Sequence, residues 1–335
     1  MSIKPLMFPL VLLFSLGLYA QPHISIQVEQ CPSADNNFRG LSAINEHSIW
    51  LSSDQGEVWF YHDEHDWENR SPKGYEKIMW RDIYAFSSES ALILSAGSPG
   101  LILKTDDAGK SWQEVYRNDS PTIFFDAFDF IGKDGMAFSD AQGELLEVIS
   151  TEDAGQTWHS LSSERFDLKV IEGQGGFAAS GTCLELLSDN ECFIVLGGPQ
   201  AILKKVSSED PQTIGLPLDH GEASQGPFSI SAKNNDSLIV VGGDYRADSL
   251  SHKSVSLSTD GGSTWQLPQA WSILENHYWS CVEWKGPRII LCSRFNTAIS
   301  LDNGQTWEII NIGFYTNHKG WFSGPGGRIG RLKPF

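Results

Sequence analysis

The chain has 335 residues, with 42 acidic side chains against 24 lysines and arginines, which gives a formal net charge of −18 at pH 7. This acidic balance excludes the broad basic face that a nucleic-acid backbone requires, and it argues against electrostatic docking on an anionic membrane. Apolar residues make up 40% of the chain and charged residues 20%, which is typical of a folded globular protein. Twelve Trp and 32 Gly against 4 Met favour β-structure with many tight turns.

The first twenty residues have the pattern of a secretory signal peptide. A single charge, Lys4, precedes an apolar run over residues 6–18, and the small residue Ala20 stands at the expected cleavage site. A retained membrane anchor is the alternative, but the run is shorter than the roughly 20 residues that span a bilayer. We therefore expect residues 1–20 to be removed on export. The mature protein is then secreted or periplasmic, with no membrane insertion.

One eight-residue motif recurs along the chain in the form S/T-x-D-x-G-x-S/T-W. Four complete copies occupy residues 105–112, 151–158, 258–265 and 300–307. The Asp can accept hydrogen bonds from backbone N–H groups two residues further on, the Gly supplies a positive φ, and the Trp buries its ring. Each copy is predicted to form the outer turn of a hairpin. The expected structural anchors are Asp107, Trp112, Asp153, Trp158, Asp260, Trp265, Asp302 and Trp307.

The spacing of the motif predicts the number of repeating units. Successive Trp anchors lie 42 to 46 residues apart, and a decayed copy at residues 207–214 fills the one double gap. Upstream, Trp67 stands 45 residues before Trp112 and marks a further degraded copy. Six units are therefore present, and a seventh begins at Phe314. It lacks an outer strand, which the alternating run at residues 24–28 can supply.

A repeat of about 45 residues with short strands is the pattern of a β-propeller, whose circular closure leaves few exposed strand edges. We predict an all-β fold in which residues 21–335 form one domain. Its seven four-stranded antiparallel blades are closed by the N-terminal strand. Six blades followed by a tail is the alternative.

The motif resembles the Asp-box, or BNR, repeat of sialidases, some other glycoside hydrolases, sortilin-type receptors and photosystem II stability/assembly factors. Copies over nearly the whole chain, with little inserted sequence, are most similar to the assembly-factor group and its exported bacterial relatives. The resemblance implies a propeller that binds a partner as a scaffold, without catalysis. Such repeats occur on proteins with many activities, so they indicate the fold far more strongly than the function.

A second regularity marks the start of each predicted inner strand, where an aromatic residue precedes a variable one. The pairs are Phe38-Arg39, Trp80-Arg81, Phe125-Asp126, Phe177-Ala178, Phe228-Ser229, Trp279-Ser280 and Phe314-Tyr315. Because neighbours on a strand point to opposite faces, the aromatics should pack between blades and the second residues should ring a central channel. Turns after the second strands lie on the same face. The predicted funnel residues are Arg39, Asp54, Arg81, Asp126, Asp140, Asp244, Tyr245, Arg246, Arg294 and Tyr315.

These residues support two functions of different kinds. Arg39 and Arg81 can clamp an anionic group through bidentate hydrogen bonds, which favours a module that binds a protein or a carbohydrate. Asp126 and Asp140 can instead act as general acid and base if the pKa of one is raised, which would make the protein a glycoside hydrolase. Residues 38–41 lack the Ile-Pro of the sialidase arginine motif. We therefore favour a monomeric, non-enzymatic binding module.

Export also makes the five cysteines candidates for disulfide bonds. Cys281 and Cys292 lie symmetrically about a Gly-Pro turn signal, so they should face each other across a hairpin as a disulfide candidate. The alternative is that all the cysteines are small buried hydrophobic residues. The pairing of Cys31, Cys183 and Cys192 stays open. No Cys-x-x-Cys, complete calcium loop or dinucleotide-binding glycine motif occurs, so we expect no metal and no cofactor.

Overall fold

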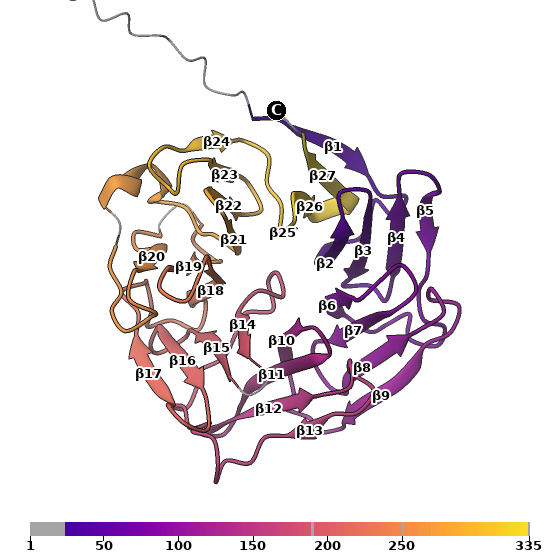
Figure 1. Ribbon diagram of the computed structural model, residues 1–335, viewed down its shortest axis with the longest axis horizontal. Helices are drawn as coiled ribbons and strands as arrows, with labels where there is room; N and C mark the ends of the chain where they lie inside the picture. Colours follow the sequence, from indigo (N-terminus) through magenta and orange to yellow (C-terminus); the bar gives the residue numbers. More distant parts are fainter. Residues whose placement is uncertain (1–23, 189–190, 249–250, 268, 334–335) are drawn as a thin grey trace, which may run out of the picture.

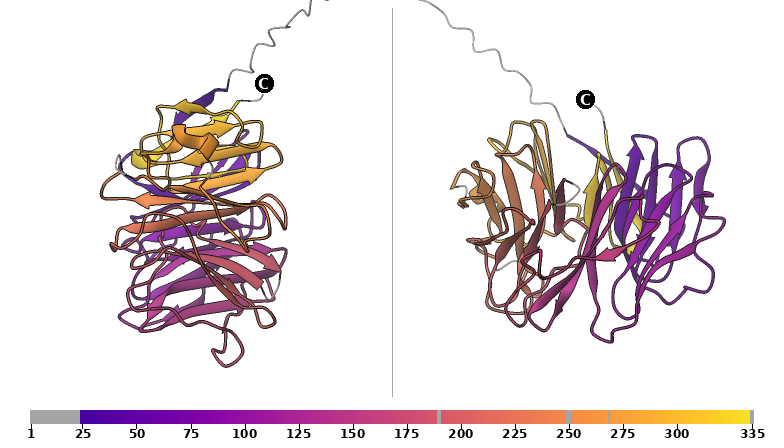
Figure 2. Two further views of the ribbon diagram at one scale, coloured as in Figure 1. Left: turned by 90° about the vertical axis from the view of Figure 1, so that its left-hand side faces the viewer. Right: turned by 60° about the horizontal axis from the view of Figure 1, so that its bottom comes forward.

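The computed structural model describes residues 24–188, 191–248, 251–267 and 269–333. The predicted signal peptide at residues 1–20 lies outside them. Seven antiparallel sheets surround a central axis, which confirms the predicted seven-bladed β-propeller, and the six-bladed alternative is wrong (Figure 1). In the side views of Figure 2 the strands cross the disc from one face to the other.

The first three blades each contain four strands and follow one another along the chain. Blade 1 consists of β2 (Phe38–Asn45), β3 (Ser48–Ser53), β4 (Val58–His62) and β5 (Asp66–Asn69). Blade 2 consists of β6 (Trp80–Ala85), β7 (Ala91–Ser95), β8 (Gly100–Thr105) and β9 (Gln113–Asn118). Blade 3 consists of β10 (Phe125–Ile131), β11 (Asp134–Gln142), β12 (Leu145–Thr151) and β13 (His159–Ser160).

The next three blades include one departure from the repeat. Blade 4 consists of β14 (Leu184–Ser188), β15 (Glu191–Leu196), β16 (Ile202–Val206) and β17 (Gln212–Gly215). Blade 6 consists of β21 (Cys281–Lys285), β22 (Arg288–Cys292), β23 (Thr297–Ser300) and β24 (Glu308–Ile310). Blade 5 has only three strands among the described residues, β18 (Gln225–Ala232), β19 (Leu238–Asp244) and β20 (Val255–Ser258). Its outer edge is reduced to a single bridge between Leu257 and Gln266, followed by a short 3-10 segment, η1 (Gln269–Leu274).

Blade 7 joins the two ends of the chain. Its inner strands are β25 (Thr316–His318), β26 (Trp321–Ser323) and β27 (Arg328–Leu332), with the turn η2 (Pro325–Gly327) before the last. The outer strand is β1 (Ile26–Gln30), which pairs antiparallel with β27 from Ile26 opposite Leu332 to Gln30 opposite Arg328. The strand begins and ends two residues later than the sequence pattern suggested. This pairing of an N-terminal with a C-terminal strand closes the propeller.

The hydrophobic core lies between adjacent blades, because the second and third strands of a blade face a neighbour on both sides. Every residue of β3, β7 and β8 is buried, whereas the outer strand β9 is largely exposed. Aromatic residues at the starts of the inner strands fill the spaces between blades, and Phe38, Trp80, Phe125, Trp279 and Phe314 have no exposed surface. We call the face where the inner strands begin the funnel face. The opposite face is the box face.

The four motif copies form turns with one shared hydrogen-bond pattern. In the turn at residues 151–158, the Thr151 hydroxyl donates to Asp153 at 2.8 Å and accepts from the Gly155 N–H at 3.0 Å. Asp153 also accepts the N–H and the hydroxyl of Thr157, at 2.9 and 2.7 Å. The Asp therefore reaches the N–H four residues further on, not two as we expected. The turns at Asp107, Asp260 and Asp302 repeat these bonds.

A ring of seven hydrogen bonds links the inner strands around the axis. Each inner strand is an edge strand, so the backbone N–H groups that face the channel need acceptors from outside the sheet. In every case a side chain of one blade accepts an N–H of the next. The pairs are Ser42 with Ala85, Asp82 with Phe128, Asp129 with Leu186, Glu185 with Ala232, Ser231 with Trp284, Glu283 with Lys319, and His318 with Ala43. Burial lowers the pKa of His318 to about 3, so its ring is neutral and Nδ1 accepts the bond.

The expectation that Phe177-Ala178 begins an inner strand is wrong. That strand is β14, which starts at Leu184, and residues 176–182 instead form an axial segment that extends toward the centre of the ring (Figure 1). Its groups bond to blades far away in sequence: Ser180 Oγ donates to the Ser280 carbonyl at 2.8 Å, and Thr316 donates to the Ser180 carbonyl at 3.2 Å. The segment makes hydrogen bonds to residues of blades 6 and 7 in place of the strand pairing that the repeat would offer.

All five cysteines are buried free thiols, so the predicted Cys281–Cys292 disulfide is not formed. The predicted register is right, since the two residues are partners across the β21–β22 hairpin. Each sulfur instead accepts a hydrogen bond from the Asn317 amide nitrogen, at 3.4 and 3.5 Å. Burial raises the pKa of both thiols and keeps them protonated. Cys31, Cys183 and Cys192 are also unpaired.

In the part of the chain that the structure describes, we find no helix with the length and apolar character needed to cross a membrane.

Candidate functional site

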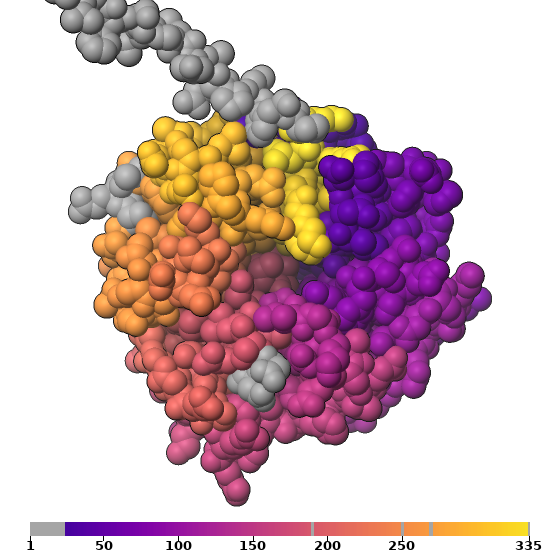
Figure 3. Space-filling view, viewed as in Figure 1, coloured from indigo at the N-terminus to yellow at the C-terminus, as the bar shows by residue number. Residues whose placement is uncertain are grey.

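A cavity of about 420 Å³ opens at the funnel face of the axis. The space-filling view in Figure 3 shows the ring hollowed at its centre. The structure brings six of the ten predicted funnel residues to its wall, namely Arg39, Arg81, Asp140, Tyr245, Arg294 and Tyr315. Its other lining residues are Phe124, Gly176, Phe177, Ala178, Ala179, Phe228 and Tyr278. The axial segment therefore forms part of the cavity's boundary.

Two arginines on one side of the cavity carry positive charges that form no direct ion pair among the described residues. Arg39 donates to the Ala179 carbonyl at 3.1 Å and stacks over the Tyr315 ring at 4.1 Å, and Arg81 donates to the Ala178 carbonyl at 3.2 Å. No ion pair among the described residues includes either guanidinium, and the Nε of Arg81 is buried without a partner. Burial, and then the nearby Arg39, lower the pKa of Arg81 to about 10. An anion placed here would relieve both effects.

Arg294 differs from the other two arginines. It is ion-paired with Asp248, whose side chain is mostly buried, and its own side chain is nearly half exposed. Its charge is therefore already balanced. The anion-binding capacity of the cavity belongs chiefly to Arg39 and Arg81.

Aromatic rings cover the opposite side of the cavity. Phe177 and Phe228 are stacked with centroids 4.0 Å apart and planes 12° apart, and Tyr278 meets Phe228 edge-on at 5.1 Å. Tyr245 lies at the edge of both phenylalanines and is 39% exposed. The cavity thus combines a cationic wall on blades 1 and 2 with an aromatic wall on blades 4 to 6. Such a site suits a ligand that carries an anionic group and an apolar group.

Asp126 and Asp140 lie together but differ in access. Asp140 lines the cavity and accepts the Gly176 N–H at 2.8 Å, whereas both carboxyl oxygens of Asp126 are buried. Burial raises the pKa of Asp140 to about 6, and burial together with the neighbouring Asp140 holds the pKa of Asp126 well above its usual range. A Cβ at Gly176 would lie 2.7 Å from the Asp126 Cγ, so the axial segment covers this carboxyl group closely. Asp126 does not line the cavity, so only Asp140 of this pair is placed to meet a sugar or a water there, whereas the hydrolase hypothesis requires both.

The remaining predicted funnel residues serve local structure around the cavity. Asp54 accepts the backbone and amide N–H groups of Asn37 at 3.3 and 2.9 Å. Asp244 accepts the Arg246 N–H at 2.9 Å and the Gln225 amide at 3.2 Å. The Arg246 guanidinium lies over the Tyr245 ring at 5.8 Å. None of the three lines the cavity.

Sequence reasoning missed several cavity residues. Tyr278 and Phe124 each directly precede the aromatic residue that marks an inner strand, and the repeat gave no reason to select them. Ala178 was expected at the channel and Ala179 was not, and no side-chain pattern reveals that their carbonyl oxygens accept hydrogen bonds from Arg81 and Arg39. Only the aromatic character of Tyr278-Trp279 and Phe124-Phe125 could have indicated that both neighbours are used.

A second cavity, of about 270 Å³, lies further along the axis toward the box face. Its wall includes four of the carboxyl groups that accept the hydrogen bonds between neighbouring inner strands, namely Asp82, Asp129, Glu185 and Glu283. Burial raises the pKa of Glu185 to about 8 and that of Asp129 to about 6, and the pKa of Asp82 is also raised. These carboxyl groups are occupied by the hydrogen bonds between blades. We assign them a structural role.

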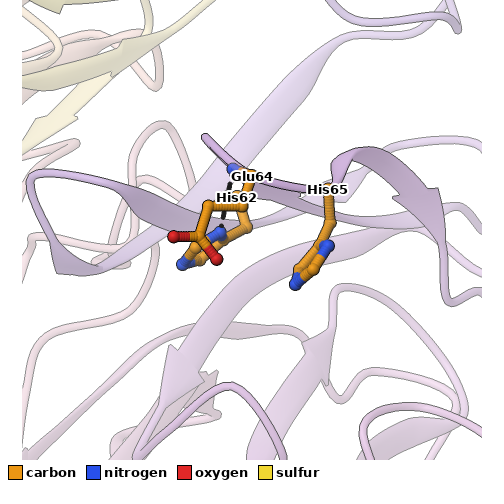
Figure 4. A group of neighbouring side chains, drawn as sticks. All are labelled: His62, Glu64 and His65. Atoms are coloured by element: carbon orange, nitrogen blue, oxygen red, sulfur yellow. Dashed lines mark hydrogen bonds between the residues drawn. The ribbon is translucent and has the colours of Figure 1, made fainter.

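A group of possible metal ligands lies at the end of β4 and in the turn that leads to β5 (Figure 4). His62, Glu64 and His65 place their ligand atoms within 4.8 Å of one another, and the two imidazole rings are stacked at 5.3 Å. The Glu64 N–H donates to His62 Nδ1 at 3.1 Å, which puts the proton of the neutral ring on Nε2. Binding a metal at Nε2 would cost this bond. Glu64 and His65 are exposed.

The fold and the cavity define the chain as a seven-bladed β-propeller with a ligand-sized cavity at one mouth of its axis. No protein-family model matches the chain, and no curated protein matches it. It is similar in structure to YCF48, a photosystem II assembly factor, bound to a D1 peptide, with a TM-score of 0.68 at 14% identity over 94% of this chain and 97% of that one.

Propellers of other kinds are similar to nearly the same degree. Virginiamycin B lyase from Staphylococcus aureus gives a TM-score of 0.66 at 12% identity over 93% of this chain and 100% of that one. The WD40 propeller domain of Doa1 gives 0.63 at 10% identity over 93% and 98%. At such identities the likeness shows the fold. The resemblance of the motif to that of the assembly-factor group agrees with these structural similarities on the fold.

Proposed function

We propose that the protein is an exported, non-enzymatic propeller that binds a peptide segment of a partner protein in the funnel cavity. The observation that carries the proposal is the pair Arg39 and Arg81, two cations held by backbone carbonyls, with no carboxylate in ion-pair contact among the described residues. A partner carboxylate would neutralise them, and an adjacent apolar side chain would lie against Phe177 and Phe228. A YCF48 structure of the same fold holds a peptide, which supports a peptide ligand.

The test is calorimetric binding of N-acetylated peptides that end in Phe, with either a free or an amidated C-terminus. We expect the free carboxylate to bind at least tenfold more tightly, because only it can pair with the arginines. Arg81→Gln and Arg39→Gln should each remove most of this difference. Arg165→Gln, at an exposed arginine outside the cavity, is the matched control and should bind like the wild type.

A carbohydrate ligand is the competing outcome of the same experiment. A panel of acidic and neutral glycans should bind no more tightly than the amidated peptide. Glycan binding that Arg81→Gln abolishes, in the absence of any peptide binding, would overturn the proposal.

A further inference from the structure

A third cavity continues from the funnel across the same face, and its floor is made of glycine. This glycine groove has a volume of about 320 Å³ and is lined by Asp140, Ala141, residues 173–177, Gly197, Gly198 and Ala223. Asp140, Gly176 and Phe177 line the funnel cavity as well, so the two spaces share a wall. The groove runs over the loops of blades 3, 4 and 5.

The floor of the groove exposes backbone because side chains cannot be placed there. A Cβ at Gly175 would lie 2.2 Å from Asp140 Oδ1, and one at Gly198, where φ is +92°, would lie 2.5 Å from the Gly173 carbonyl oxygen. The Gly197 N–H donates to the Gly175 carbonyl at 2.9 Å and joins the two sides of the floor. A ligand in the groove therefore meets main-chain groups at close range.

Gln174 supplies an unused hydrogen-bond donor at this floor. Its side chain is 4% exposed, and its Oε1 accepts the Ile171 N–H at 3.1 Å, which fixes the orientation of the amide. The Nε2 group has no partner among the described residues. A buried donor without an acceptor is unfavourable, and a carbonyl group of a ligand would satisfy it.

We propose that the partner's peptide lies extended in the glycine groove, with its terminal carboxylate at Arg39 and Arg81. This inference rests on the proposed function and specifies how the chain that leads to the carboxylate is held. An extended peptide offers main-chain carbonyl groups to the unpartnered Gln174 amide, and the glycines let its backbone approach the floor closely. The charge of the arginines fixes its direction, with the C-terminus in the funnel. The residue nearest the carboxylate then faces Phe177 and Phe228.

The experiment compares two N-acetylated peptides that share a free C-terminal Phe, one of two residues and one of six. Both reach the arginines, but only the longer one extends into the groove. We expect the six-residue peptide to bind at least tenfold more tightly by calorimetry. Gln174→Leu should lower its affinity at least fivefold and leave the two-residue peptide unchanged, and Ala223→Arg, at the exposed wall, should do the same by obstruction.

Controls keep the two proposals separable. Glu172→Ala changes an exposed neighbour outside the groove lining and should bind both peptides like the wild type, and thermal melting checks the fold of each variant. Equal affinity for the two lengths, with dependence on Arg81 retained, overturns the groove and leaves the proposed function intact. An equal loss for both peptides in Gln174→Leu also overturns it. Failure of the wild type to bind either peptide overturns the proposed function and the groove together.

Discussion

The fold holds the charges of Arg39 and Arg81 in place without a direct ion pair among the described residues. Backbone carbonyls of the axial segment accept from them, and a carbonyl contributes a partial charge where a carboxylate would contribute a full one. Asp140 is the ionisable group on the cavity wall that can change this balance, since burial raises its pKa to about 6. Below that pH the wall is cationic. Above it the added carboxylate opposes an anionic ligand.

We therefore predict that binding of a carboxylate peptide weakens by about tenfold between pH 5 and pH 8, as expected for a like charge placed nearby at an effective dielectric constant of ~20. The sign follows from a raised acid pKa, because Asp140 is neutral at the lower pH and charged at the higher. Asp140→Asn keeps an acceptor for the Gly176 N–H and should remove most of the pH dependence. Calorimetry at both pH values checks this. Binding that strengthens with pH in the wild type would contradict it.

At the scale of elements, the turns formed by the four motif copies and the axial segment show where sequence reasoning succeeds and where it fails. Every hydrogen-bond partner of Asp153 lies within four residues of it, so eight consecutive residues are enough to predict the turn. The spacing between copies of the turn then predicts the number of blades. The axial segment bonds to Ser280 and Thr316, 100 and 136 residues away from Ser180. No periodic pattern records such contacts. Arg39 and Arg81 were predictable because they occupy repeated positions, whereas the carbonyl oxygens that hold them were not.

The turn chemistry predicts the effect of a single substitution. Asp153→Ala removes an acceptor of three hydrogen bonds, and we expect a loss of about 1–3 kcal/mol in the free energy of unfolding. Because hydrogen bonds from Thr157 and Thr151 hold the pKa of Asp153 at about 2 despite partial desolvation, this contribution is present above about pH 4 and is lost as the pH falls toward 2. Guanidinium chloride unfolding at pH 7 measures it. Glu152→Ala, at the exposed neighbour, should change the stability by less than about 0.5 kcal/mol.

At the scale of the whole molecule, the two cavities along the axis differ in their titratable groups. Arginines face the funnel, and carboxyl groups line the cavity toward the box face. Three of those groups have raised pKa values, with Glu185 at about 8, Asp129 at about 6 and Asp82 well above its usual range. Between about pH 5 and pH 8 these three carboxyl groups bind more protons in the folded protein than in the unfolded chain. They outweigh His318, whose pKa of about 3 makes the folded protein bind fewer protons below about pH 6.5. Its stability therefore falls as the pH rises through this window.

We predict that the free energy of unfolding is lower at pH 8 than at pH 5. Glu185→Gln retains an oxygen to accept the Ala232 N–H and removes the titration, so it should stabilise the protein by about 1–2 kcal/mol at pH 8 and change little at pH 5. Denaturant unfolding of both proteins at both pH values provides the test. The aspartates of the motif turns, such as Asp153, titrate below this window and do not affect the comparison of stability at pH 5 and pH 8. A wild type that is more stable at pH 8 would contradict the prediction.

The pairing of β1 with β27 means that the propeller closes only after its last described strand has been synthesised. β1 is the first of the described strands to leave the ribosome, and its partner β27 is the last of them. The ring can close only after β27 has been made, since the pairing partners Ile26 and Leu332 lie at opposite ends of the described chain. Until then one edge of β1 and one edge of blade 7 stay open, and a chain cut short before β27 has nothing with which to seal itself. Closure of the ring therefore depends on both β1 and β27, so loss of either strand leaves blade 7 without its closing pair.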